Sequence, residues 1–312
     1  MASACPKSAA STTGGTVLRK QQLFIGIDGG GTKCRARLES ASGHVLAEAL
    51  SGPANPATDT EQAIRSVLDA SCQALASAGF SESALGNCQV VVGLAGVNVP
   101  SALTRMEQWQ HPFAQIKVTT DLHIACVGAH GGLEGGIVIT GTGTSAFSTV
   151  AGTQHLFSAQ GFPLGDRASG AWLGWQAVCA TLDVLDGLQP PSGLTQALCR
   201  TLAVRSNMDL VACCLHYKAV DYAVLAPLVL QWHQQHDTKA MAIVELGLTY
   251  IQALLQRLEQ TGANRIAMLG GLAPAWSQLL PDSFSQQLSP VLSSAEAGAV
   301  ALARQLFMET SP

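Results

Sequence analysis

The chain has 312 residues, of which 47% are hydrophobic and 12% charged, and its formal net charge is −4. This length suits two compact units, because one hydrophobic core rarely grows beyond about 250–300 residues. The acidic balance excludes the basic surface that nucleic acid needs, and the most apolar windows, such as residues 219–232, fall short of the roughly 18–20 residues of a membrane span.

The N-terminal segment and the cysteines indicate the compartment. Residues 1–21 contain Ser, Thr, Gly and Lys without an apolar signal segment, and we predict a flexible tail there. Nine scattered cysteines without CxxC spacing are typical of a reducing environment. We therefore predict a cytoplasmic protein that binds neither nucleic acid nor membrane.

The first predicted elements form a β-hairpin. Strands at residues 23–28 and 32–39 are joined by three glycines, and Cys34, Ala36 and Leu38 alternate with charged residues, so one face is buried. A helix over residues 59–78 follows, with Thr58 and Glu61 spaced as a capping box and a glycine at its end. Strands at 89–94 and 116–119 and a helix at 122–129 complete the first half.

The second half repeats the opening hairpin. Residues 25–38 and 137–150 are identical at five of fourteen aligned positions, and both read as strand, glycine turn, strand. The boundary between halves is expected near residues 131–136. Two halves built on one plan would place two glycine turns face to face across a cleft.

The remainder is predicted to be mostly helical. Helices are expected over residues 170–185, 193–203, 208–218, 223–235, 239–261 and 294–308, with a short strand at 265–269. Alternating strands and helices in both halves favour α/β layers.

The two glycine turns are candidate phosphate sites. Successive glycines let backbone N–H groups converge on an anion, because no Cβ blocks the approach and positive φ is accessible. Either turn alone would be read as an ordinary hairpin, but two in matching contexts favour phosphate binding. Lys33 is a weaker phosphate candidate that could equally be a solvated strand residue.

Two aspartates are candidates for chemistry. Asp28 precedes the first glycine turn, where it would hold Mg²⁺ or cap the turn. Asp121 follows a strand and begins a helix, so it is either a general base or a helix N-cap.

Further ligand contacts are expected from two loops. Residues 161–174 combine glycines with Asp166, Arg167 and Ser169 at the start of a helix, whose N-terminus favours an anion. Asn55, before Pro56, would bind a sugar hydroxyl or amide, or serve as a turn residue.

These motifs together resemble a known family. DGGGT at 28–32, GTGTS at 141–145, GPAN, TD, LGDRASGAWLG and LGGL in series are similar to the N-acetylglucosamine and glucosamine kinase group of the BadF/BadG/BcrA/BcrD-type ATPases, over residues 23 to about 303. The resemblance implies an α/β fold of two actin-like (ribonuclease H-like) ATPase lobes with a ligand cleft between them. Residues 22–132 with helix 296–309 would form one lobe, and residues 133–295 the other.

The resemblance also implies a site and a reaction. ATP phosphates would bind Gly29, Gly30, Gly31, Thr32, Lys33, Gly141, Thr142, Gly143 and Thr144, and adenosine would bind Gly270 and Gly271. Asp121 would be the catalytic base and contact the sugar together with Asn55, Gly161 and Asp166, while Asp28 would hold Mg²⁺ directly or through water. The implied reaction is phosphorylation of N-acetylglucosamine to its 6-phosphate, with glucosamine as the alternative acceptor, and the resemblance allows a homodimer.

Some features depart from the family pattern, and two other functions stay open. Relatives commonly have GTGS at the second loop, and Arg167 stands where Glu or Gly is expected. An ATPase that activates an electron-transfer partner would need cysteines near the second loop, where residues 143–150 have none. A sugar-binding regulator without turnover is the other alternative, although no helix-turn-helix segment precedes the core.

Overall fold

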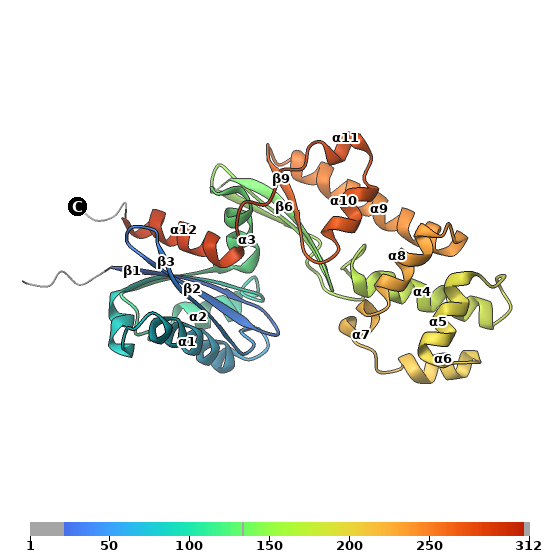
Figure 1. Cartoon of the computed structure of the whole chain (residues 1–312), viewed down its shortest axis with the longest axis horizontal. Coiled ribbons are helices and arrows are strands. Elements are labelled where there is room, and N and C mark those ends of the chain that lie inside the picture. The colour runs from blue at the N-terminus through green and yellow to red at the C-terminus, as the bar shows by residue number, and fades with distance from the viewer. Residues whose placement is uncertain (1–21, 133, 309–312) are drawn as a thin grey trace, which may run out of the picture.

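The computed structural model describes residues 22–132 and 134–308, so the predicted tail at 1–21 and residue 309 of the helix expected in the first lobe lie outside the described residues. The strands form two mixed sheets, with orders β3-β2-β1-β4-β5 and β8-β7-β6-β9. Figure 1 shows the sheets next to each other, with a group of helices extending from the second sheet. The predicted α/β class is confirmed.

The first sheet is built on the predicted hairpin. Its strands are β1 (Leu23–Gly29), β2 (Cys34–Ser40), β3 (Val45–Ser51), β4 (Cys88–Leu94) and β5 (Gln115–Thr120). β1 is antiparallel to β2 and parallel to β4. Ile25 and Ile27 point toward helix α1 (Thr60–Ser77), whereas Phe24 packs beneath helix α12 (Ala295–Met308). The edge strand β3 was not predicted.

The start of α1 differs from the prediction. Asp59 is the N-cap, and its side chain accepts a hydrogen bond from the Gln62 amide at 2.9 Å. The predicted capping box of Thr58 and Glu61 was therefore wrong by one position. The helix ends as expected, since Gly79 has a φ of +81° that other residues rarely adopt.

The second sheet has the same plan as the first. Its strands are β6 (Gly135–Thr140), β7 (Thr144–Val150), β8 (Thr153–Phe157) and β9 (Ile266–Leu269). β6 is antiparallel to β7 and parallel to β9, as β1 is to β2 and β4. The repeat inferred from the two hairpins thus extends to an additional strand on each side.

The helical part of the second half surrounds its own core, which includes Trp172, Val229, Ile251 and Trp276. The predicted helix at 223–235 is interrupted, because α7 ends at Ala223 and α8 begins at Ala226 with Pro227 in its first turn. The helices of this part are α4 (Gly170–Leu185), α5 (Gly193–Leu202), α6 (Asn207–Cys214), α7 (Ala219–Ala223), α8 (Ala226–Gln234), α9 (Thr238–Glu259), α10 (Ala273–Leu279) and α11 (Asp282–Ser285).

Helix α9 corrects one expectation. It is the one helix in the described part of the chain whose length and composition would suit a membrane span, although no apolar window was expected to be long enough. Its buried residues recur every three or four positions, including Ala240, Ile243, Val244 and Gly247, and it packs against α4 and α8. This spacing accounts for its apolar composition as one face of a core helix.

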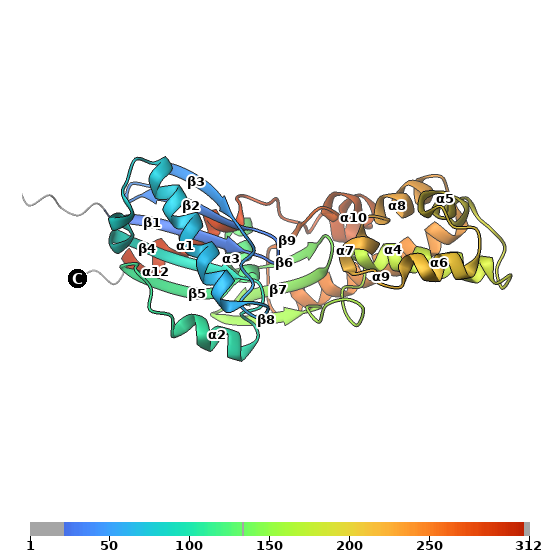
Figure 2. The same ribbon diagram turned by 90° about the horizontal axis from the view of Figure 1, so that it is seen from below.

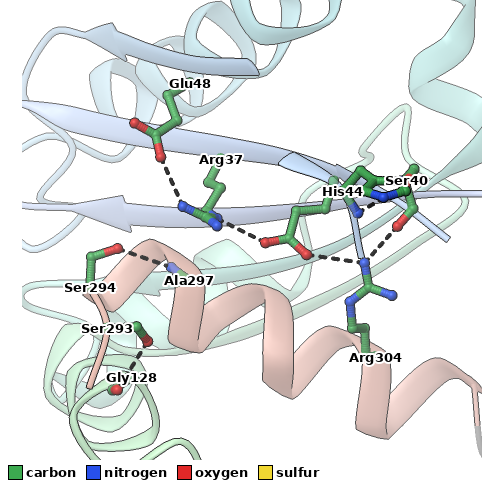
Figure 3. A network of polar contacts seen from close by, with 10 residues as sticks. Arg37, Ser40, His44, Glu48, Gly128, Ser293, Ser294, Ala297 and Arg304 are labelled. Atoms are coloured by element: carbon green, nitrogen blue, oxygen red, sulfur yellow. Dashed lines mark hydrogen bonds and ion pairs between the residues drawn. The ribbon is translucent and has the colours of Figure 1, made fainter. Parts of the chain in front are cut away.

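The last helix returns to the first sheet. α12 lies along β1 and contacts α3 (Asp121–His130), as Figure 1 shows. A Cβ at Gly26 or at Gly298 would overlap backbone atoms of the facing element, so both glycines permit a close approach. Figure 3 shows the far end of α12, where Arg304 donates hydrogen bonds to the Ser40 carbonyl (2.6 Å) and to Glu39 (3.1 Å).

Candidate functional site

A cavity of about 430 Å³ lies where the two sheets meet. The first sheet contributes the ends of β4 and β5 with the start of α3, and the second contributes β7 and β8. The lining residues are Leu94, Ala95, Gly96, Asn98, Thr120, Asp121, Leu122, Ser145, Phe147, Gln154, His155, Leu156 and Ala159. Asp121 is the one predicted site residue among them.

Asp121 is the first residue of α3, at the carboxyl end of β5. The helix is capped by Thr120, whose hydroxyl accepts a hydrogen bond from the His123 amide at 3.1 Å, so the alternative interpretation of Asp121 as the N-cap was wrong. Oδ1 of Asp121 accepts a hydrogen bond from the Leu122 amide at 2.9 Å. Burial raises the pKa of Asp121, which strengthens it as a proton acceptor.

Asp28 shares an electrostatic environment with Asp121. Burial raises the pKa of Asp28 to about 6, and the negative charges of Asp121 and Glu296 contribute to this rise, while Arg35 and Lys33 oppose it. Glu296, in the first turn of α12, is itself only 8% exposed. The structure therefore brings Asp28 near Asp121 in a negative field that favours a bound cation.

The first glycine turn is shaped by close packing. Gly29 has no room for a Cβ between Leu94 and Ala54, whereas a Cβ at Gly31 would meet no atom within 4 Å. The Gly30 amide donates to the Lys33 carbonyl at 2.9 Å and closes the turn, and Thr32 and Lys33 are exposed. None of the three glycines has a positive φ, so the expected role of left-handed backbone was wrong here.

The second glycine turn is held by the start of α4. The Gly170 amide donates to the Gly141 carbonyl at 2.7 Å, and the Ala171 amide donates to the Thr142 carbonyl at 3.2 Å. These amides of the α4 N-terminus therefore bind the loop, which corrects the expectation that they would attract an anion. Gly141 and Gly143 do not have positive φ either.

Asp166 contacts the second turn, and neither Asp166 nor Gly161 lines the cavity. The Thr144 amide donates to Asp166 Oδ1 at 3.1 Å, and a Cβ at Gly143 would press against the same carboxylate. Burial raises the pKa of Asp166, and the amide bonds oppose the rise. Gly161 has a φ of +76°, and its carbonyl accepts from the Gly165 amide.

Asn55 lies at the edge of the cavity. Its Oδ1 accepts a hydrogen bond from the Ala57 amide at 3.0 Å, so the turn interpretation is correct for that oxygen. Gly96, which lines the cavity, has a φ of +86°, and a Cβ there would collide with Asn55 Oδ1. The side-chain amide nitrogen of Asn55 has no hydrogen bond within residues 22–132 and 134–308.

Gly270 and Gly271 follow β9 and contact the second turn. The Leu272 amide donates to the Thr140 carbonyl at 3.0 Å, and Gly270 has a φ of +93°. A Cβ at Gly141 would have the Gly271 amide nitrogen as its neighbour, at 4.0 Å. A further cavity of about 430 Å³ borders Gly270 and is lined by Met268, Pro274 and Val291 among others.

Several cavity residues were not found from the sequence. Gln154 and His155 lie on β8, which was not predicted, although the Ala151–Gly152 pair after β7 is a turn signal that could have indicated a second hairpin. Asn98 and Gly96 follow β4 in a turn without a regular pattern. Their position at the carboxyl end of a parallel strand was the available signal.

A family model for the BadF/BadG/BcrA/BcrD ATPase family matches residues 25–287, which include both glycine turns, Asp28 and Asp121. The chain belongs to this family. Within the BadF/BadG/BcrA/BcrD ATPases, it is 33% identical to the glucosamine kinase GspK of Vibrio cholerae over 90% of this chain and 95% of that protein.

Two further similarities bear on the family assignment. An N-acetylmuramic acid/N-acetylglucosamine kinase of Clostridium acetobutylicum is 29% identical over 61% of this chain and 63% of the relative. A crystal structure of a Chromobacterium violaceum protein assigned as an N-acetylglucosamine kinase has 31% identity and a TM-score of 0.82, over 91% of this chain and 99% of that one. The expected actin-like sugar kinase fold is thereby confirmed.

Proposed function

We propose that this BadF/BadG/BcrA/BcrD-family protein is an ATP-dependent amino sugar kinase of the cytoplasm that converts N-acetylglucosamine to its 6-phosphate. One observation carries the proposal. Asp121 lines a cavity bounded by both sheets, and its negative charge helps to raise the pKa of Asp28 beside the first glycine turn. A proton acceptor on one side and a cation-favouring carboxylate on the other are what phosphoryl transfer to a hydroxyl requires.

Each group of site residues would have its own role in the reaction. Asp121 would accept the proton of the sugar hydroxyl as that oxygen attacks the γ-phosphorus, and ADP would leave. Residues 29–33 and 141–144 would hold the phosphates, with Thr32 and Thr142 presenting exposed hydroxyls. Gly270 and Gly271 would lie along the adenosine. Asp166, bonded to the Thr144 amide, would hold the second loop in place. Its contact with the sugar, like those of Asn55 and Gly161, stays a prediction, since none of the three lines the cavity.

The charge around Asp28 fits Mg²⁺. A half-buried carboxylate with Asp121 and Glu296 nearby favours a cation, and Mg²⁺ is usually held in kinases by one or two carboxylates, water and nucleotide phosphates. When bound, Mg²⁺ would neutralise the charge that spreads over the transferring phosphoryl group. Asp28 would orient it directly or through water.

The cavity lining favours an acetylated sugar. Asp121 is the one carboxylate among its lining residues, whereas Leu94, Ala95, Leu122, Phe147, Leu156 and Ala159 present apolar surface. A buried ammonium group needs an anionic partner, but an acetamido group places a methyl group on apolar surface at no such cost. This chemistry supports N-acetylglucosamine over glucosamine as the acceptor.

The cysteine positions weigh against the electron-transfer alternative. Cys126 is buried and donates to the Gly135 carbonyl at 3.4 Å, and no cysteine occurs between it and Cys179. Ligands for an iron–sulfur cluster are therefore lacking in the sequence beside the second glycine turn.

We also propose the division into lobes given above, with residues 22–132 and 296–309 in one and 133–295 in the other. The packing of α12 on β1 and α3 supports it over residues 296–308. A homodimer stays a prediction.

The test is coupled ADP release with Mg-ATP and each of N-acetylglucosamine, glucosamine, N-acetylmannosamine and glucose, with a sugar-free control. We expect release that depends on N-acetylglucosamine. ADP release that depends on glucosamine alone would make glucosamine the acceptor in place of N-acetylglucosamine. Equal ADP release without sugar would indicate an ATPase of another function.

A further inference from the structure

The wall behind Asp121 contains a polar contact between the two sheets. His123, on the same first turn of α3, lies with Nδ1 2.9 Å from the Thr119 hydroxyl on β5 and 3.3 Å from the side-chain nitrogen of Gln154 on β8. Its ring also lies 5.9 Å from that of Phe147 on β7. One imidazole therefore touches strands of both sheets, and Figure 2 shows β5, α3 and β8 where these sheets adjoin.

The chemistry of these partners determines the tautomer. With its side-chain nitrogen toward the ring, Gln154 donates, so Nδ1 of His123 is the acceptor and the proton lies on Nε2. The Thr119 hydroxyl then donates to the same lone pair of Nδ1, which the Thr119 and Gln154 donors share. Burial, followed by the positive charge of Lys117, lowers the pKa of His123, so the ring is neutral at pH 7 as both hydrogen bonds require.

Gln154 also separates two cavities. It lines the cavity that contains Asp121 and, on the other side, a second cavity of about 310 Å³ that contains His123 and Lys117. Thr120, the cap of α3, is the other residue common to both linings. The contact between His123 and Gln154 thus forms part of the partition between them.

We propose that His123 and Gln154 are a positioning pair, which holds the first turn of α3 against β8 and so fixes Asp121 relative to the acceptor hydroxyl. This inference rests on the proposed kinase function. Neither residue touches the reacting atoms. The pair acts through Asp121, by holding the helix turn that carries this carboxylate in place.

A double-mutant cycle tests the pair. His123→Phe keeps a ring against Phe147 without the acceptor, and Gln154→Leu keeps the side-chain volume without the donor. Each variant is expected to lower kcat for the sugar about 3- to 10-fold, the range for loss of a hydrogen bond between neutral groups. The double variant should be no slower than the slower single variant, and KM for Mg-ATP should stay within about twofold in all three.

Two further readouts distinguish positioning from general damage. The ratio of sugar-independent ATP hydrolysis to sugar phosphorylation should rise in the variants, whereas Thr153→Val, on the same strand but outside both cavities, should leave kcat and this ratio unchanged. Additive losses of kcat in the double variant, or an unchanged kcat in both single variants, would overturn the proposal that His123 and Gln154 act as a pair.

Nitrogen NMR of labelled His123 makes the test independent of turnover. At pH 7.5 we expect an unprotonated Nδ1 whose chemical shift changes in Gln154→Leu. A protonated Nδ1, or a shift unmoved by that variant, would refute the pair even in an active kinase. An enzyme that phosphorylates no amino sugar while showing the expected NMR signals would instead refute the proposed function and, with it, the catalytic role of the pair.

Discussion

Asp121 is the residue whose removal should separate chemistry from nucleotide binding. Asp121→Asn keeps the hydrogen bond from the Leu122 amide through its remaining oxygen but cannot accept the proton. We expect kcat to fall about 10²- to 10⁴-fold, as general-base losses do, with KM for Mg-ATP nearly unchanged. Steady-state kinetics with N-acetylglucosamine would check this, and turnover within tenfold of the wild type would exclude the role.

The ionised side chain of Asp28 should lower the free energy of unfolding, although the proposed function needs it. A pKa of about 6 instead of 3.8 means that the ionised carboxylate destabilises the fold by roughly 3 kcal/mol. Because the pKa of Asp28 is higher in the folded protein than in the unfolded chain, the stability gained by keeping this side chain protonated is fully present below pH 3.8. It is lost as the pH rises through 6.

Asp28→Asn should therefore be inactive yet more stable than the wild type at pH 8, by an amount up to about 3 kcal/mol that shrinks toward pH 5. Urea unfolding at the two pH values measures this. A variant that is less stable at pH 8 would show that the carboxylate makes favourable contacts in the folded protein.

Helix α3 should respond to acid through His130. Nε2 of His130 lies 2.9 Å from the Gly136 carbonyl, its Nδ1 is buried without a hydrogen-bond partner in the described residues, and burial lowers its pKa below 6.5. A lowered folded pKa gives stability that is present above pH 6.5 and lost as the pH falls through the folded value.

We therefore expect the wild type to lose more unfolding free energy than His130→Gln between pH 7.5 and 5, since Gln carries no titrating proton. Comparing the pH dependence of the two proteins removes the opposite effect of Asp28, which both share. Parallel curves would show that His130 does not titrate in this range.

Helix α12 is fastened to the first sheet by Arg304. Besides its bonds to Ser40 and Glu39, this guanidinium donates to the Ala41 carbonyl at 2.9 Å and lies 4.5 Å from the centre of the Phe24 ring. Arg304→Met should cost about 2–3 kcal/mol of unfolding free energy, because it also leaves Glu39, 8% exposed, with one partner fewer.

Arg65→Met is the matched control, since Arg65 forms an exposed pair with Glu61 at 3.7 Å that should contribute under about 0.5 kcal/mol. Denaturant unfolding of both variants provides the comparison. Equal losses would mean that the contacts in Figure 3 do not hold α12 in place.

The molecule as a whole should couple its two ligands. The cavity is bounded by both sheets, so a sugar bound there contacts both halves, and a nucleotide held by the two glycine turns does the same. We expect N-acetylglucosamine and Mg-ADP together to raise the Tm by more than the sum of their separate effects. Additive shifts would indicate that the halves bind their ligands independently.

Local pattern determined much of this protein. Hydrophobic patterning and glycine turns located β1, β2, α3 and α4, because these signals act within a few residues along the chain. The repeat of the opening hairpin could be recognised in the amino-acid sequence, and it correctly predicted two sheets with the same strand arrangement. Asp121 could be placed at a strand end, where ligands collect in α/β folds.

Only the tertiary structure determined the contacts between segments that are distant in sequence. The bond from the Thr144 amide to Asp166, the packing of Gly29 against Leu94, and the wall that β8 contributes all join segments distant in sequence. The electrostatic environment of Asp28 depends likewise on Glu296, which comes from the last helix of the chain. Burial, charge proximity and close approach depend on how the two sheets and α12 pack, and no short stretch of sequence contains that information.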